Sequence, residues 1–169
     1  MDNIDPYLCT HIIYVPVNLE DILSCQSGNQ KPSCTNSPRH PVGQFVSVLR
    51  EKNPKLRLMI SVGNWKDRDS ETYAKEVAIN NGENLRSFAH LAREYLTRFG
   101  LHGLDFSWPW QGASPSSGVN SQFFVRLLKV LNKEFQSKFL LSASVSASQS
   151  VAEESKYYCL ISNFIAKLF

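Results

Sequence analysis

Four apolar segments recur along the chain, and amphipathic segments separate them. The apolar segments are rich in β-branched and aromatic side chains and are bounded by turn residues, which indicates buried strands; they span 11–15, 56–63, 100–110 and 139–145. The first strand is predicted to stop before Pro16, because proline lacks the backbone N–H that a sheet ladder uses.

The segments between the strands carry apolar residues at helical spacing, which predicts helices at 42–49, 85–99 and 123–135. Asn84 is the expected N-cap of the second helix and Gly100 its stop. A Ser, Pro and Gly loop is expected at 112–118, and a further helix and the start of a fifth strand at 152–158 and 160–165.

This alternation of strands and helices is typical of βαβ units in a parallel sheet. A doubly wound sheet usually carries a glycine-rich phosphate loop, and the sequence has neither Gly-x-Gly-x-x-Gly nor Gly-x-x-x-x-Gly-Lys. The prediction is therefore an α/β protein built as a barrel.

The third strand carries the candidate chemistry. Leu104, Phe106 and Trp108 alternate with Asp105, Ser107 and Pro109, so the two sets point to opposite faces. One face is apolar and suits the core, and the other brings a carboxylate toward the C-terminal end of the strand.

Composition changes this picture little. The chain has 169 residues, of which 43% are hydrophobic and 20% charged, which suits one globular domain or a large part of one. The net charge of +3 is scattered, so nucleic-acid binding is not indicated. No apolar run is long enough to span a membrane, and the N-terminus does not resemble a signal peptide. The oligomeric state is not indicated.

Four cysteines allow three pairings: Cys9, Cys25, Cys34 and Cys159. Cys25 and Cys34 bracket a polar, turn-rich loop, so a disulfide between them is the most economical choice. A zinc site using Cys9, His11, Cys25 and Cys34 is the alternative, but no Cys-x-x-Cys pair exists. We expect no metal and no cofactor.

Several ordered segments resemble the chitinases and chitinase-like proteins of glycoside hydrolase family 18, which fold as (β/α)8 barrels. Residues 3–14 resemble the family's second strand, 55–65 its third, 140–147 its fifth and, weakly, 163–169 its sixth. Residues 102–109 align with the fourth-strand signature Asp-Gly-x-Asp-x-Asp-x-Glu, matching it at Gly103 and Asp105, and Trp108 also stands where the family leads us to expect it. The resemblance implies a partial TIM barrel of about strands two to six, with residues 1–169 as an incomplete domain.

The departures from this signature concern catalysis. In the family, the last position is a glutamic acid that protonates the glycosidic oxygen, and the aspartate before it orients the N-acetyl group of the substrate. Here these positions hold Pro109 and Ser107. Proline has no proton to give, and Asp105 lies roughly 13 Å back along the strand. We therefore expect a catalytically inactive protein.

The resemblance also suggests sugar-binding residues. Trp65 follows the end of its strand, where barrel loops build sites. Trp110 lies just past the signature strand, at the family's Tyr position, and Tyr14 is expected to face the barrel interior, where the family position packs near substrate. Asp105 has two readings, a functional carboxylate or a buried acid that hydrogen-bonds neighbouring strands. His11 and His102 are expected to be structural, because no nucleophile accompanies them.

The expected function is that of a chitinase-like protein that binds chitin or N-acetylglucosamine oligomers, extracellular like the family it resembles. The alternatives are an active chitinase that uses a substitute acid, and a truncated fragment without autonomous function. Because the family commonly pairs the cysteine at position 9 with one on strand one, Cys9 is expected to be a free thiol unless it pairs with Cys159.

Overall fold

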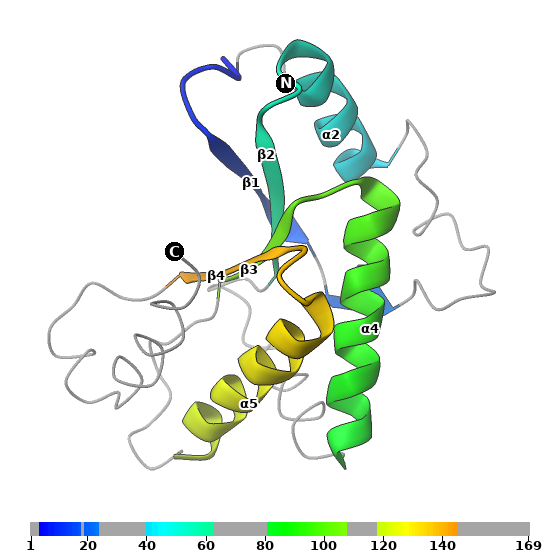
Figure 1. Cartoon of the computed structure of the whole chain (residues 1–169), viewed down its shortest axis with the longest axis vertical. Coiled ribbons are helices and arrows are strands. Elements are labelled where there is room, and N and C mark those ends of the chain that lie inside the picture. Colours follow the sequence, from blue (N-terminus) through cyan, green and yellow to red (C-terminus); the bar gives the residue numbers. More distant parts are fainter. Residues whose placement is uncertain (1–3, 18, 24–39, 63–80, 108–117, 145–169) are drawn as a thin grey trace, which may run out of the picture.

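The computed structural model describes residues 4–17, 19–23, 40–62, 81–107 and 118–144. Four strands in these ranges form one parallel sheet in the order β1-β2-β3-β4 (Figure 1). Their bounds are β1 His11–Val17, β2 Arg57–Val62, β3 Gly103–Ser107 and β4 Leu140–Ser144. Each strand pairs with the next one in the sequence, as expected for successive βα units.

The described helices lie between successive strands along the chain: α1 Leu19–Leu23, α2 Pro41–Lys52, α4 Asn81–Phe99 and α5 Gly118–Phe135. Helix α4 packs against α5, α1 and α2, and Figure 1 shows α4 and α5 side by side. The predicted helices at 42–49, 85–99 and 123–135 are confirmed, and so is the parallel sheet. Among the described residues, no helix has the length and apolar character needed to cross a membrane.

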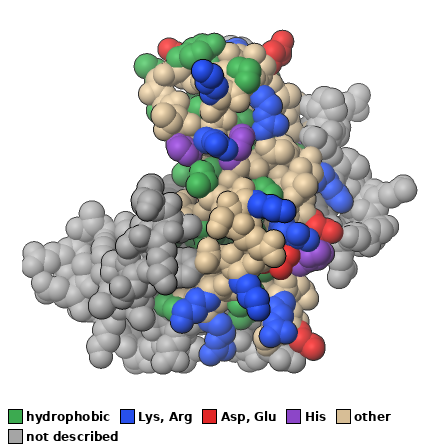
Figure 2. All heavy atoms as spheres, in the orientation of Figure 1, with side chains coloured by type: hydrophobic (Ala, Val, Ile, Leu, Met, Phe, Trp, Pro, Cys, Tyr) green, Lys and Arg blue, Asp and Glu red, His purple; other side chains and the backbone are tan. Residues whose placement is uncertain are grey.

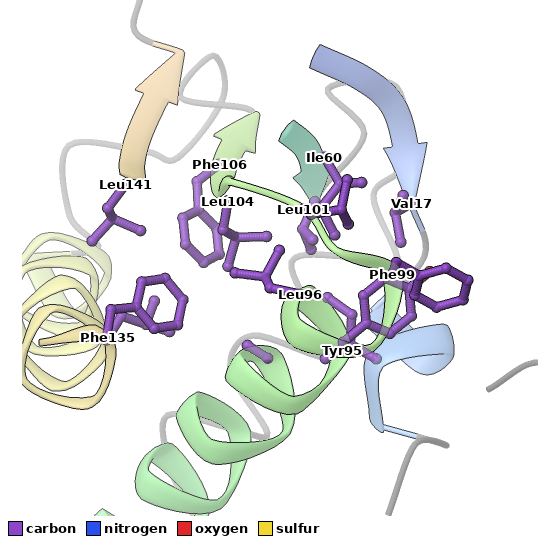
Figure 3. Close-up of a cluster of buried hydrophobic side chains, with 14 of the residues drawn as sticks. Val17, Ile60, Tyr95, Leu96, Phe99, Leu101, Leu104, Phe106, Phe135 and Leu141 are labelled. Carbon is purple, nitrogen blue, oxygen red and sulfur yellow. The ribbon is translucent and has the colours of Figure 1, made fainter. Parts of the chain in front are cut away.

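The hydrophobic core fills the layer between the sheet and the helices (Figure 3). Leu104 and Phe106 project into it from β3, and Phe135 of α5 and Leu96 of α4 meet them from the helix side. Leu104 is completely buried and Phe106 is 2% exposed. The predicted alternation along β3 is therefore confirmed for its apolar side, which faces the helices.

Helix α4 ends at a glycine, as predicted. Gly100 has φ 65°, a left-handed conformation that costs glycine little, and the Leu101 N–H bonds the Leu96 carbonyl at 2.8 Å. The Arg50 guanidinium of α2 donates to the Gly100 carbonyl. This C-terminal cap of α4 directs the chain into β3.

The predicted end of the first strand is wrong, because β1 runs through Pro16 to Val17. The register shifts between Tyr14 and Val17, which pair with Ile60 and Val62, so β1 holds one extra residue there. A bulge on the outermost of the described strands needs no N–H at every position, so the ladder accommodates proline.

The predicted starts of α4 and α5 were wrong, and helix α1 was not predicted. Helix α4 begins at Asn81, so Asn84 lies inside its first turn and is not the cap, and α5 begins at Gly118. Neither extension contains an apolar stripe that could have signalled it. Helix α1 is only five residues long, too short for periodicity to reveal. The helix and strand expected at 152–158 and 160–165 lie outside the described residues.

Candidate functional site

Asp105 is the centre of the candidate site, and its side chain is 5% exposed. The Ser61 hydroxyl donates a hydrogen bond to its Oδ2 atom at 2.7 Å, and the Ser142 hydroxyl donates to its Oδ1 atom at 2.6 Å. Both oxygens of the carboxylate are thus held from neighbouring strands. Asp105 is placed as the buried-acid interpretation expects.

The strand register explains this arrangement. Ser61 of β2 and Ser142 of β4 are the Cα partners of Asp105, so the three side chains share one level and one face of the sheet. Side chains alternate along each strand, so this face is opposite to that of Leu104 and Phe106. In a closed barrel it is the inner face.

Gly103, two residues before Asp105 on the same face of β3, lies in very close contact with Leu140 and Met59. A Cβ atom at this position would lie 2.6 Å from the Leu140 carbonyl oxygen and 2.9 Å from Cε of Met59. Met59 therefore occupies the space that a side chain would need. The glycine is required here for close approach, and it sets how tightly β2, β3 and β4 pack on the inner face.

The chemistry open to Asp105 is narrow. A carboxylate that already accepts two short hydroxyl hydrogen bonds is well suited to fix the three strands relative to one another. It is poorly suited to deliver a proton to a bound substrate, because a general acid must lie within hydrogen-bond reach of the leaving atom. The arrangement favours a positioning role.

Tyr14 does not face the inner side of the sheet, so that expectation is wrong. Its ring lies 5.1 Å, centroid to centroid, from the ring of Phe45 on α2, and it packs against the hydrophobic core with Ile12. The alternation of β1 places residues 12 and 14 on the helix side. The role of Tyr14 in sugar binding loses its geometric basis.

Most of the other predicted site residues lie outside the described ranges. These are Trp65, Trp110, Pro109, Cys25 and Cys34, and also Trp108, Cys159 and the proposed zinc pairing that used Cys25 and Cys34. Ser107 is the last residue of β3, where its backbone pairs with Ser144. Their roles remain predictions from the sequence.

His102 is part of the strand framework. Its ring atom Nδ1 accepts a hydrogen bond from the backbone N–H of Leu58 at 3.0 Å. Its backbone N–H donates to the Leu58 carbonyl, and its backbone carbonyl accepts from the Leu140 N–H. Burial lowers the pKa of His102, and the positive charges of Arg57 and Arg50 lower it further. The structural interpretation of His102 agrees with these contacts.

Cys9 is exposed and is a free thiol. His11, two residues on, contacts the Thr10 hydroxyl through Nδ1 at 2.9 Å. Within the described residues, no group of three or more His, Cys, Asp and Glu side chains is arranged to hold a metal ion.

Ser61 and Ser142 are the site residues that sequence reasoning missed. Each interrupts an otherwise apolar strand, in Leu58-Met59-Ile60-Ser61 and in Leu140-Leu141-Ser142. A hydroxyl inside a buried strand needs a hydrogen-bond partner, and Asp105 is the acid on the strand between them. The two serines within apolar strands were therefore a signal in the sequence, but they can be assigned to Asp105 only when the order of the strands is known.

A parallel sheet with its helices along one face, and a buried carboxylate on the other, is the arrangement of part of a (β/α)8 barrel. The model of the glycosyl hydrolases family 18 matches residues 1–166. The chain therefore belongs to glycosyl hydrolases family 18.

The relatives that this chain matches include chitinases. Chitotriosidase-1 of Mus musculus is 27% identical, covering 89% of this chain and 32% of its own length. Among solved structures, the Group IV chitinase of Ostrinia furnacalis is 28% identical with a TM-score of 0.67. An E-to-L mutant of catalytic domain 2 of the Group II chitinase from the same insect, in complex with the oligosaccharide (NAG)5, is 27% identical with a TM-score of 0.66. Each covers 91% of this chain and 40% of the solved chain, so the chain spans well under half of the proteins it matches.

Proposed function

We propose that this chain is a chitinase-like protein that binds chitin or N-acetylglucosamine oligomers without hydrolysing them. The observation that carries the proposal is the environment of Asp105. It is the carboxylate that remains on the signature strand, and both of its oxygens accept hydrogen bonds from Ser61 and Ser142.

The substitutions at the end of the strand support the absence of turnover. Ser107 and Pro109 stand where the family has its last two acids. General acid catalysis typically contributes 10²–10⁴-fold to the rate, and charge stabilisation of the transition state is a further large term. A site that lacks both acids loses both contributions, and buried Asp105 is too far back along β3 to replace them.

The binding half of the proposal rests on relatives and on sequence. The Ostrinia furnacalis domain solved with (NAG)5 is a mutant in which leucine replaces one glutamate, so a domain of this family that lacks a carboxylate accommodates the oligosaccharide. Trp65 follows β2 in sequence, at the end of the strand where barrel loops build ligand sites, and aromatic faces suit sugar rings. Tyr14 is no longer part of this proposal.

A hydrolysis assay tests the catalytic half. The chain is incubated with a chromogenic chitooligosaccharide, and we expect the native chain to release no more chromophore than the Asp105→Asn variant does. The matched test is the double variant Ser107→Asp and Pro109→Glu, which restores the acids of the signature. Turnover by the native chain that disappears in Asp105→Asn would overturn the proposal and favour a substitute acid.

Calorimetric titration with an N-acetylglucosamine pentamer tests the binding half. Trp65→Ala is expected to weaken binding by about tenfold, because an aromatic contact in a ligand site is worth on the order of 1–2 kcal/mol. Tyr7→Ala is the control, since Tyr7 is an exposed aromatic residue that lies before β1 in sequence. If the native chain gives no binding heat, or if Trp65→Ala binds as tightly as the native chain, binding at this position is refuted.

We further propose that residues 1–169 form part of a single barrel domain and that the protein is extracellular. The family match over residues 1–166 and the continuous sheet of the four described strands support the first statement. Membership of the chitinase family supports the second. Secretion of a tagged full-length product from expressing cells would test the location directly.

A further inference from the structure

The N-terminal ends of the strands carry a group of basic side chains with no described acidic partner. We name this group the basic edge; it consists of His11, Arg57 and His102 at the strand starts, together with Arg50 in the last turn of α2. His11 opens β1 and Arg57 opens β2, and the two residues are Cα partners across the sheet. His102 immediately precedes β3, and its ring accepts the N–H of Leu58, the residue after Arg57. The fold thus gathers side chains that are far apart in sequence.

The side chains of the basic edge are electrostatically close. After burial, the charges of Arg57 and Arg50 are the main cause that lowers the pKa of His102, and His11 adds to them. Within the described residues, none of the four forms an ion pair with a carboxylate, although ion pairs do connect α4 and α5. Figure 2 shows histidine and Lys or Arg side chains adjacent on the upper part of the visible face, without an acidic side chain between them.

Several hydrogen-bond donors of this group are unused. Because Nδ1 of His102 accepts from Leu58, the neutral ring carries its proton on Nε2, and Nε2 is a donor. Nδ1 of His11 contacts the Thr10 hydroxyl, and in the tautomer in which Nδ1 accepts from this hydroxyl the Nε2 atom of the neutral ring is a donor. Arg57 is exposed, and its guanidinium has no described partner. Arg50 bonds the Gly100 carbonyl and contributes mainly its charge.

We propose that the basic edge binds a tetrahedral oxyanion, phosphate or sulfate, held by Arg57 and the two histidines. A guanidinium fork matches two oxygens of such a group, and neutral imidazole Nε2–H groups can donate to a third. Like charges held together without a carboxylate are unfavourable, and a bound anion relieves that repulsion. The oxyanion can be free or can be an ester on a sugar.

This site is separate from the proposed sugar site. Parallel strands bring their N-terminal ends to one edge of the sheet and their C-terminal ends to the other, where barrel enzymes build their catalytic sites. Asp105 is thus further along β3, on the inner face, and the basic edge is at the strand starts. Saturating phosphate should leave the affinity for an N-acetylglucosamine pentamer unchanged, so the two proposals fail independently.

The test is a titration of the full chain with inorganic phosphate at low ionic strength, followed by NMR of backbone amides and histidine rings. We expect the Leu58 amide and the His102 ring signals to shift together, and the apparent affinity to fall as salt is added, because exposed charges are screened. Arg57→Gln is expected to weaken binding about tenfold, since it removes a charge-assisted pair. Arg86→Gln, an exposed arginine on α4, is the matched control and should bind as the native chain does.

Absence of any shift at Leu58 and His102 in tens of millimolar phosphate would overturn the proposal. So would a titration of Arg57→Gln that matches the native chain, provided its amide spectrum shows the native fold. The source of the oxyanion is separated by repeating the titration with N-acetylglucosamine 6-phosphate. Tighter binding of the ester assigns a sugar-borne group, and equal binding assigns the free anion.

Discussion

Asp105 and Gly103 lie two residues apart on the same face of β3, and their neighbours constrain them in different ways. An aspartate is required at position 105 because two serine hydroxyls donate hydrogen bonds to its carboxylate oxygens. Gly103 is fixed by what surrounds it, because Leu140 and Met59 leave no room for a Cβ atom. A buried polar group needs partners, and a close contact needs the absence of atoms.

Replacing Asp105 by asparagine is expected to destabilise the fold. The amide nitrogen cannot accept a hydrogen bond, so one of the two serine hydroxyls loses its acceptor inside the sheet, at a cost of about 1–3 kcal/mol. Urea unfolding of Asp105→Asn measures this cost. Asp5→Asn, at an exposed aspartate, is the control and should change stability by under about 0.5 kcal/mol. Equal stability of the two variants would contradict the structural role of Asp105.

Substituting alanine at Gly103 tests the close contact. The new Cβ would lie 2.6 Å from the Leu140 carbonyl oxygen, which is backbone and cannot move freely, so we expect a loss of about 1–3 kcal/mol. Gly82→Ala is the matched control, since nothing lies within 4 Å of a Cβ there. Alanine in the first turn of α4 should be neutral or stabilising by about 0.5–1 kcal/mol. The midpoints of chemical denaturation compare the two variants.

At the scale of elements, helices α4 and α5 are joined by a polar contact on the outside and apolar packing inside. Glu134 of α5 meets Arg93 Nε at 3.0 Å and His90 Nδ1 at 3.4 Å, both on α4. Beneath them, Leu131 is fully buried against the core. Exposed ion pairs contribute little and buried leucines contribute much, so the packing should dominate.

This ranking can be measured with two single variants. Leu131→Ala should cost about 2–5 kcal/mol, because it leaves a cavity where α5 covers the sheet. Glu134→Gln should cost about 1 kcal/mol or less and should lose its effect in high salt. Thermal unfolding of both variants at low and high ionic strength would decide the order. A larger effect of Glu134→Gln would mean that the ion pairs, and not the core, hold α5 in place.

The sequence predicted the existence of the elements better than their ends. Apolar stripes located the main bodies of α2, α4 and α5, because burial of one face imposes periodicity. The first turns of α4 and α5 are polar, so nothing periodic marked them. Pro16 argued locally against a strand, but a bulge at the outermost described strand overrode that local preference.

The inner face was harder to predict than the core. The alternation along β3 correctly separated Asp105 from Leu104 and Phe106, but it could not name the hydroxyls that Asp105 accepts from. Those come from strands 44 and 37 residues away and depend on register. Tyr14 failed for a related reason: its side was assigned by resemblance, while the alternation of β1 put it with Phe45.

At the scale of the whole molecule, pH acts on stability through His102. Its pKa in the folded chain lies below the ordinary value of 6.5, so between these two values the unfolded chain binds more protons than the folded chain. The stability due to neutral His102 is complete above pH 6.5 and decreases as the pH falls below it.

We therefore expect urea unfolding of the native chain to show falling stability below about pH 6.5, and the His102→Gln variant to show a weaker fall over the same range. Glutamine keeps an oxygen that can accept from Leu58 but carries no titrating group. Arg86→Gln, at an exposed arginine on α4 that carries no group titrating in this range, is the control and should retain the native dependence. Identical pH profiles for the native chain and His102→Gln would exclude His102 as the cause.

The order of the four described strands has a further consequence for biosynthesis. Each strand bonds only to the one made immediately before it and the one made immediately after it. Once β1, α1, α2 and β2 have left the ribosome, β1 and β2 can pair without any later segment of the chain. Helix α4 and strand β3 can then add at the free edge of β2. During synthesis the N-terminal segments leave the ribosome first. The sheet can therefore grow in the direction of translation, each new strand pairing with the edge that the previous strand left open.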